Sequence, residues 1–334
     1  MQAPAVEGPY FDDLAVGQDF GRAPGLTLTP GLAAAHQAIT GDRLALALDH
    51  ELCHQVTGGG ALAPPGLVWD VAIGQSTVVT QHVKANLFYR GLAFRRVSRL
   101  GDTLRTTTRV VALRQNRPRE GRAPTGLAVL RITTVDQQRR PVLDFWRCAM
   151  LPLRDQASQT GHADDLDSVG HPPGPASPQV LTDGWRLDRF ARQAAGPRLG
   201  DLRPGQSWPV ACGDVVSSAP ELARLTLNVA AVHHDAAAAG GRRLVYGGHA
   251  IGLALAQAVR SLPSIVTVAA WHSCDHLGPV HEGETLRSTI SVEQVEELPG
   301  GGGLVHLRSE VRADGAEGSP PRDVLDWRYI AVVA

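Results

Sequence analysis

Three segments of the first half of the chain recur in the second half at almost constant spacing. FDDLAVGQDF begins at residue 11 and LGDLRPGQSW at 199, GDTLRTTTRV begins at 101 and GETLRSTISV at 283, and VLDFWR begins at 142 and VLDWRY at 324. The spacing is therefore 188 residues for the first pair and 182 residues for the other two. Three separated matches at near-constant spacing indicate a tandem duplication. The chain is thus expected to fold as two copies of one unit.

The stretch between the two copies, DQASQTGHADDLDSVGHPPGPASPQV at 155–180, is rich in Gly, Pro, Ser and Asp. Such a composition buries too little apolar surface to fold alone, so it reads as a linker. We predict an N-terminal half over residues 1–155, a linker over 156–178 and a C-terminal half over 179–334. The linker is expected to be the least ordered internal segment.

Each half has the same order of elements, with an alanine-rich helical stretch, a loop, an apolar helix and then a run of strands. The helix that begins at Gly247 is apolar on every side, so it must lie inside other structure. The strands alternate as half-buried antiparallel strands do, and are expected over 104–114, 126–135, 142–153, 285–298, 303–313 and 324–333. One buried helix followed by meandering strands predicts an α+β fold, a sheet curled round a central helix.

Composition excludes several classes of protein. The 334 residues are 43% hydrophobic and 19% charged, with a net charge of −1, which gives no general attraction to nucleic acid or anionic membrane. No apolar run reaches the length of a membrane span, and no secretory signal is recognised at the N-terminus. The four cysteines are widely spaced without a CxxC pair, so reduced thiols in a cytoplasmic protein are expected.

Two glycines, Gly247 and Gly248, stand at the start of the apolar helix. The first N–H groups of a helix have no partner inside the helix and suit a negatively charged or carbonyl oxygen. Glycine also lets a ligand approach the backbone closely. The pair therefore indicates an oxyanion site, and a tight turn is the alternative.

These residues carry a resemblance to a known family. The stretches LNVAAVHHDAAAAGGRRLVYGGHAIGLA at 227–254 and GPVHEGETL at 278–286 resemble the MaoC-like enoyl-thioester hydratases and dehydratases, and within them the double hot-dog subgroup of mesaconyl-CoA hydratase (β-methylmalyl-CoA dehydratase). The resemblance covers nearly the whole chain apart from the linker. It implies a tandem hot-dog fold with each apolar helix wrapped by its sheet, and no cofactor.

The family motif implies roles for individual residues. Its histidine, the acid and base of water addition, falls on His233, and its trailing aspartate falls on Asp235. Its catalytic aspartate falls on Asn228, a departure that leaves open which group replaces the carboxylate. A glycine N–H at the start of the central helix polarises the thioester carbonyl, which points to Gly247 and Gly248.

The first half departs further from the motif. Asp42 stands at the aspartate position, but Ala47 replaces the histidine. We therefore expect only the second half to hold a working site, with the first half shaping the substrate tunnel. Asp42 is a further candidate for contact with the substrate, since it could replace the carboxylate that Asn228 lacks.

Other side chains near the motif are weaker candidates. Tyr246 is expected either to point its hydroxyl into the tunnel or to pack as an aromatic, and Arg243 either to meet phosphates of the carrier or to be solvated. His272, Cys274 and His276 would share one face of a strand, which raises the question of zinc. A fourth ligand is missing and His276 corresponds to Phe94 of the first half, which favours a tunnel-lining or packing role. We therefore expect no metal.

The leading hypothesis is a hydro-lyase that acts on a thioester of CoA or of an acyl carrier protein, on a mesaconyl-CoA-like substrate. A hot-dog thioesterase, which would use a carboxylate near the helix, is the first alternative. A non-catalytic acyl-binding or scaffold protein is the second, because neither half has the full Asp/His pair. A homodimer is also expected.

Overall fold

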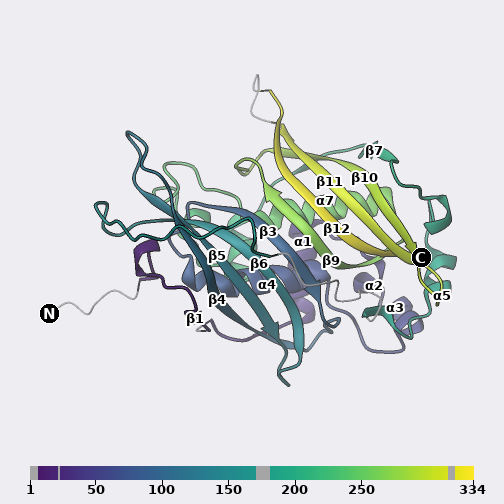
Figure 1. Cartoon of the computed structure of the whole chain (residues 1–334). Helices are drawn as coiled ribbons and strands as arrows, with labels where there is room; N and C mark the ends of the chain where they lie inside the picture. Colours follow the sequence, from purple (N-terminus) through teal and green to yellow (C-terminus); the bar gives the residue numbers. More distant parts are fainter. Residues whose placement is uncertain (1–6, 22, 171–180, 315–319) are drawn as a thin grey trace.

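The computed structural model describes residues 7–21, 23–170, 181–314 and 320–334. Within this part of the chain the strands form a 12-stranded sheet whose main path runs β1-β4-β5-β6-β3-β9-β12-β11-β10-β7. The first five strands of this path belong to the first half and the last five to the second (Figure 1). The two halves thus share one continuous sheet, which confirms the predicted double hot-dog architecture.

The first half contains η1 (Phe11–Asp13), β1 (Asp19–Phe20), β2 (Leu26–Thr27), α1 (Pro30–Thr40), α2 (Ala45–Leu48), α3 (His50–Thr57), α4 (Pro65–Gln75), η2 (Ser76–Val79), β3 (Ala85–Phe94), β4 (Thr103–Gln115), β5 (Thr125–Val135) and β6 (Pro141–Pro152). The second half contains α5 (Leu187–Gln193), η4 (Leu199–Asp201), β7 (Ser207–Pro209), β8 (Asp214–Val215), α6 (Ala219–Leu225), η5 (Ala231–His233), α7 (Gly247–Ser261), β9 (Ile265–His276), β10 (Thr285–Glu297), β11 (Gly303–Asp314) and β12 (Arg322–Val333). Four long strands follow the central helix in both halves.

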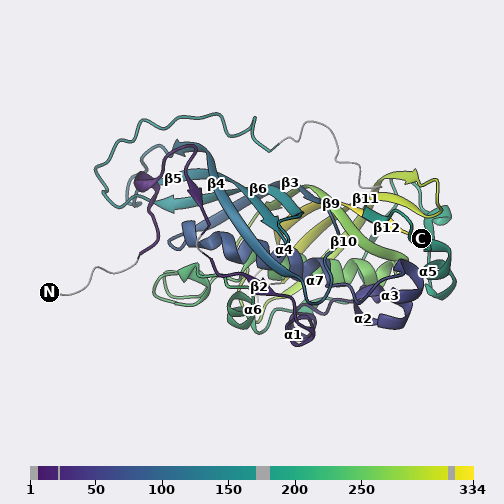
Figure 2. The same ribbon diagram turned by 90° about the horizontal axis from the view of Figure 1, so that it is seen from below.

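The central helices α4 and α7 lie on the same face of the sheet and contact each other (Figure 2). All eleven residues of α4 are buried, and in α7 the run from Gly248 to Val259 is buried without a break. A helix can be apolar on every side only if the sheet covers one side and other helices cover the rest. The prediction of a wholly enclosed helix is therefore confirmed.

The seam between the halves is the pairing of β3 with β9. Tyr89 stands opposite Cys274 and Phe88 opposite Asp275, and Arg90 forms an ion pair with Asp275 at 2.6 Å. These two strands were not among the predicted ones. Both pair with register shifts, which break the apolar alternation that identifies a strand from sequence.

The repeated G-[DE]-T-L motif is a turn in both halves. Asp102 accepts a hydrogen bond from the backbone N–H of Arg99 at 2.8 Å, and Glu284 accepts one from the N–H of His281 at 2.9 Å. The same contact at equivalent positions explains why the motif recurs. Its role is structural, since it fixes the entry into β4 and β10.

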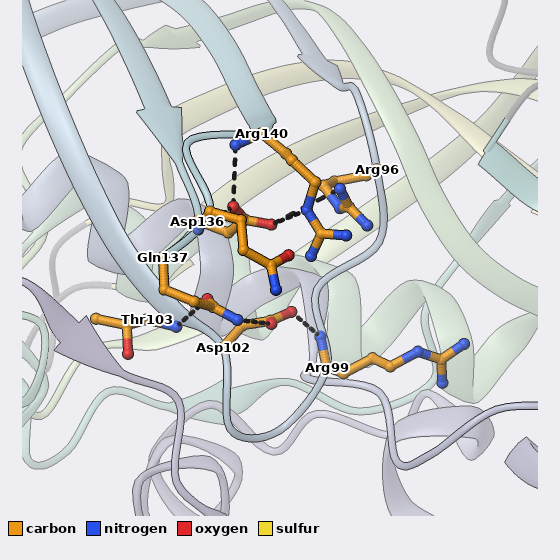
Figure 3. Close-up of polar contacts among 8 residues, drawn as sticks. Arg96, Arg99, Asp102, Thr103, Asp136, Gln137 and Arg140 are labelled. Atoms are coloured by element: carbon orange, nitrogen blue, oxygen red, sulfur yellow. Dashed lines mark hydrogen bonds and ion pairs between the residues drawn. The ribbon is translucent and has the colours of Figure 1, made fainter.

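In the first half this turn is joined to the neighbouring turn between β5 and β6 (Figure 3). The Gln137 amide donates to Asp102 at 3.0 Å, and its oxygen accepts from the N–H of Thr103 at 3.0 Å. Asp136 accepts from the Arg140 guanidinium at 2.7 Å. These contacts fasten one end of the first-half sheet.

The described part of the predicted linker, residues 156–170, is packed rather than free. Ala163 pairs with Arg114 in an isolated bridge, and the Asp164 carboxylate accepts the N–H of Leu113 at 2.9 Å. Leu166 is buried against the outer face of the first-half sheet. The rest of the predicted linker, residues 171–178, lies outside the described residues, so the domain boundaries stay a prediction.

None of the described helices combines the length and apolarity needed to cross a lipid bilayer.

Candidate active site

A cavity of about 320 Å³ lies at the seam, beside the N-terminus of α7. Both halves line it. The polar and glycine positions from the second half are Asn228, His233, Tyr246, Gly247, His276 and Gly278, and the polar side chains from the first half are Thr77, Lys84, Asn86, Tyr89 and Arg147. The remaining lining is mostly aliphatic, so the space suits an acyl chain with a few fixed polar contacts.

His233 ends the short helix η5 and faces this cavity. Its Nδ1 lies 2.8 Å from the carbonyl oxygen of Leu244. A carbonyl can only accept, so Nδ1 carries the proton and Nε2 keeps its lone pair. Burial lowers the pKa of His233 to about 4, so the ring is neutral near pH 7. The side chain is therefore a base with one free, oriented nitrogen.

Asn228 lies at the start of the same loop and is almost completely buried. Its side-chain oxygen accepts the N–H of Ala230 at 3.0 Å, and its backbone carbonyl accepts from His234 Nε2 at 2.6 Å. The next residue, Val229, donates its N–H to Thr77 of the first half at 2.9 Å. The loop is thus held on both sides, and the amide NH2 of Asn228 is left to face the cavity.

The first turn of α7 reaches the cavity at Gly247. Within the described chain, no acceptor binds the backbone N–H of Gly247 or Gly248. A Cβ on Gly247 would lie 2.6 Å from the His276 ring, and a Cβ on Gly248 would collide with the carboxylate of Asp70. Both positions are therefore restricted to glycine. Gly247 borders the cavity, whereas Gly248 lies behind it.

His276, at the end of β9, is the second histidine in the cavity. Burial lowers its pKa to about 4, and its Nε2 is buried without a partner among the described residues. Its ring makes an edge-to-face contact with Tyr89, 5.7 Å between centroids. The ring lies against Gly247 in the same cavity wall.

Tyr246 presents its ring to the cavity but not its hydroxyl. The hydroxyl donates to the Asp70 carboxylate on α4 at 3.1 Å, and the other Asp70 oxygen lies 2.9 Å from His36 Nε2. Burial raises the pKa of Asp70. Of the two alternatives left open for Tyr246, this hydrogen bond favours packing over a hydroxyl in the tunnel. The His36–Asp70–Tyr246 chain instead fixes the approach to Gly247 from behind.

Sequence reasoning missed Arg147, the buried guanidinium in the cavity wall. Leu143, Phe145 and Arg147 alternate along β6 and all point inward. An arginine that alternates with buried apolar residues along a strand indicates a buried charge, and this pattern was present in the sequence. It comes from the half that lacks the histidine, so the motif could not reveal it.

Three of the proposed substrate contacts lie away from the cavity lining. Arg243 forms an exposed ion pair with Glu282 at 3.1 Å, and Asp235 caps the N–H of Ala237 at 2.8 Å. Asp42 is buried and accepts the N–H of Leu44 at 2.9 Å. None of the three borders the cavity. Asp42 therefore does not replace the carboxylate that Asn228 lacks.

The expected alternation of His272, Cys274 and His276 on one strand face is wrong, because β9 has a register shift at His272. His272 instead stacks on His306 on the exposed side, with 2.8 Å between ring nitrogens. Cys274 is fully buried. Among the described residues, no group of three or more His, Cys, Asp or Glu side chains could hold a metal ion.

The first half has a counterpart to the cavity, but only about 20 Å³ of it is open. Leu44, Leu46 and Ala47 occupy the places that Ala230, Val232 and His233 have in the second half. Phe94 stands at the position of His276. The helix α4 begins with Pro65 where α7 begins with Gly247, and proline has no N–H to donate.

Comparisons with known proteins place this geometry in context. No family model matches the chain. A solved conserved hypothetical protein of Mycobacterium tuberculosis, described as essential for survival during infection and as having a double hot-dog fold, is 54% identical with a TM-score of 0.91, over 98% of this chain and 99% of its own.

Two matches come from Chloroflexus aurantiacus. A solved protein described as a MaoC domain dehydratase is 26% identical with a TM-score of 0.85, over 99% of both chains. A β-methylmalyl-CoA dehydratase is 28% identical over 100% of this chain and 99% of its own.

Proposed function

The chain belongs to the MaoC-like double hot-dog hydratase and dehydratase family, and from this premise we propose that it is a hydro-lyase that reversibly adds water to an enoyl-CoA thioester. The observation that carries the proposal is the pairing of a neutral histidine with a free helix N–H across one apolar cavity. The Chloroflexus relative is named as a β-methylmalyl-CoA dehydratase, and loss of water from β-methylmalyl-CoA gives mesaconyl-CoA. This supports a mesaconyl-CoA-like substrate.

In the hydration direction, His233 Nε2 takes a proton from water while the water oxygen bonds to the β-carbon of the enoyl group. The electron pair of the double bond moves onto the thioester carbonyl, and the Gly247 N–H stabilises the resulting enolate oxygen. His233 then returns a proton to the α-carbon. The sum is one water added across one double bond.

The neighbouring groups orient these reactants. The Asn228 amide faces the cavity from the same loop as His233 and can hold the water. His276 lies against Gly247 and can donate a second hydrogen bond to the carbonyl oxygen. The hydrogen bond from His233 Nδ1 to the Leu244 carbonyl keeps Nε2 pointed at the reaction.

The thioesterase alternative needs a carboxylate that activates water at the carbonyl carbon. The described cavity lining contains no aspartate or glutamate. Asp70, on the other side of Tyr246, is engaged with His36 and Tyr246. This observation favours water addition over hydrolysis.

The test is to incubate the protein with mesaconyl-CoA and to follow two products separately. Hydration consumes the enoyl absorbance and yields a thioester heavier by one water in mass spectrometry, without free thiol. Release of free CoA, detected with a thiol reagent, would indicate the thioesterase instead. Binding without either product would indicate the scaffold protein.

Three expectations extend this proposal. The carrier is CoA, in line with the relative, and an acyl carrier protein is the second carrier to assay. A homodimer is expected in solution, which light scattering checks. A cytoplasmic location is expected, which cell fractionation checks.

A further inference from the structure

Arg147 is the one arginine among the described residues that line the cavity, and it reaches the cavity from β6 of the first half. Its side chain is 2% exposed. It donates to the Thr80 hydroxyl at 2.6 Å and to the Ser76 carbonyl at 3.2 Å, both just after α4. Its Nε is buried without a partner in the described chain. The guanidinium thus has donors to spare inside the cavity wall.

The charge of Arg147 has no counter-charge in the described residues, where no carboxylate lies within 4 Å of it. Even the more exposed arginines of the sheet have a counter-charge, since Arg308 is paired with Asp326 and Arg131 with Asp144, each at 2.8 Å. A buried unpaired cation is costly, and an arginine remains protonated. An anionic ligand in the cavity would supply the missing counter-charge.

The duplication sharpens this point. At the repeat spacing of 182 residues, the counterpart of Arg147 is Tyr329, which stacks on Trp327 at 3.8 Å and is fully buried. Tyr329 does not border the closed counterpart cavity. The buried cation is thus present only where there is open space for a ligand.

We infer that Arg147 binds a carboxylate carried by the acyl group of the substrate, and that it sets the specificity of the site for acidic over neutral enoyl-CoA thioesters. The planar guanidinium fork suits a carboxylate with two parallel hydrogen bonds. The inference rests on the proposed function for the identity of the ligand as an acyl-CoA. It adds the residue that recognises the acyl group, and the negative charge that the acyl group must carry to bind there.

The phosphates of CoA are the other anions that the same substrate offers. Arg147 lies in the cavity wall beside Tyr89 and near His233, where the acyl group reacts, whereas a nucleotide needs a wide, exposed surface. A cavity of about 320 Å³ has room for an acyl group and its thioester but not for the nucleotide end of CoA. The acyl carboxylate is therefore the partner that the geometry favours.

The kinetic test compares mesaconyl-CoA with the analogue in which its free carboxylate is a primary amide. The wild type is expected to prefer the carboxylate, and Arg147→Gln to lose about 100-fold in kcat/KM for it while the amide stays within about threefold. Arg131→Gln, an outer-face arginine of the neighbouring strand, is the matched control and should leave the preference unchanged. An equal fall for both thioesters would mean that Arg147 is only structural and would overturn the inference.

A binding test decides the matter if turnover fails. The stable thioethers S-(3-carboxypropyl)-CoA and its primary amide are titrated by calorimetry into the wild type and into Arg147→Gln, or into Arg147→Lys if the glutamine variant does not fold. We expect the wild type to bind the carboxylate at least tenfold tighter, and the variant to lose that preference. A wild type without preference, or a variant that weakens free CoA equally, overturns the inference. If the wild type prefers the carboxylate ligand but does not hydrate mesaconyl-CoA, only the proposed function is contradicted and the inference on Arg147 stands.

Discussion

The two halves present the same framework with opposite outcomes at equivalent positions. The second half keeps a histidine, a helix that begins with glycine and about 320 Å³ of open space. The first half has alanine and a helix that begins with proline, and about 20 Å³ is left open. Its side chains Leu44 and Leu46 are almost completely buried. The difference teaches that a duplicated site can be closed by a few apolar substitutions without disturbing the sheet.

The closed half still contributes to the open site. Thr77 anchors the loop that carries Asn228, and Tyr89 and Arg147 form part of the cavity wall. The reciprocal contribution to the closed cavity comes from Leu181, Val266, Thr267 and Val268, which are aliphatic or small. Each half therefore lines part of the other half's cavity. Of these two contributions, only the one from the first half contains charged side chains.

The largest effect on activity is expected at His233, whose equivalent in the first half is Ala47. His233→Ala should lower kcat/KM for hydration at least about 100-fold, because it removes the proton-transfer group. His54→Ala, an exposed histidine on α3, is the control. Steady-state kinetics with mesaconyl-CoA measure both. Unchanged turnover in His233→Ala would favour the scaffold protein.

The next contrast is Gly247 against Pro65, at the first position of each central helix. Gly247→Pro should cost about 100- to 1,000-fold in kcat, because it removes the N–H that receives the enolate oxygen. Proline is accepted at the first position of a helix, but its Cβ meets the His276 ring as an alanine Cβ does, so Gly247→Ala is the matched control. Gly247→Ala keeps the N–H and adds only the Cβ that meets the His276 ring. Equal losses in the two variants would show that the Cβ, not the N–H, matters.

A smaller effect is expected for the pair Asn228 and Asp42, which make the same hydrogen bond in the two halves. Each side chain accepts the N–H of the residue two positions later. Asn228→Ala should lower kcat about tenfold through loss of water orientation, and Asn228→Asp should retain or raise activity. Asp42→Ala should leave kcat within about threefold and lower the free energy of unfolding by about 1–2 kcal/mol. A large loss of kcat in Asp42→Ala would overturn the assignment of the working half.

These contrasts also show how far the sequence could predict the structure. The duplication, six of the eight long strands after the central helices and the buried helices follow from local patterns, because repeats and periodicity can be read along the chain. The motif leads to His233 and Gly247. Arg147 was missed because it enters the site from the opposite half, and only tertiary packing brings the two together. The two alternatives for Tyr246 could not be separated from sequence, because its partner, Asp70, is also in the other half.

The smallest effect concerns His249 against its counterpart Leu67, both on the first turn of a central helix. His249 is fully buried and neither ring nitrogen has a partner in the described chain, so the imidazole is an uncompensated polar group. Leu67 is equally buried in the corresponding place, which indicates that leucine suits this environment. His249→Leu should therefore leave the free energy of unfolding near pH 7 unchanged or raise it by about 1 kcal/mol.

The pH dependence gives this last contrast its sharper test. Burial lowers the pKa of His249 to about 4, whereas an imidazole in the unfolded chain titrates near 6.5. Between these values the unfolded chain binds more protons, so the wild type should lose stability as the pH falls from about 6.5 to about 4, and none above that window. His233 and His276 contribute in the same direction. His249→Leu should make this loss shallower, as measured by urea unfolding near pH 7 and near pH 5. An equal loss in the variant and the wild type would mean that His249 finds a partner for its proton in the folded protein.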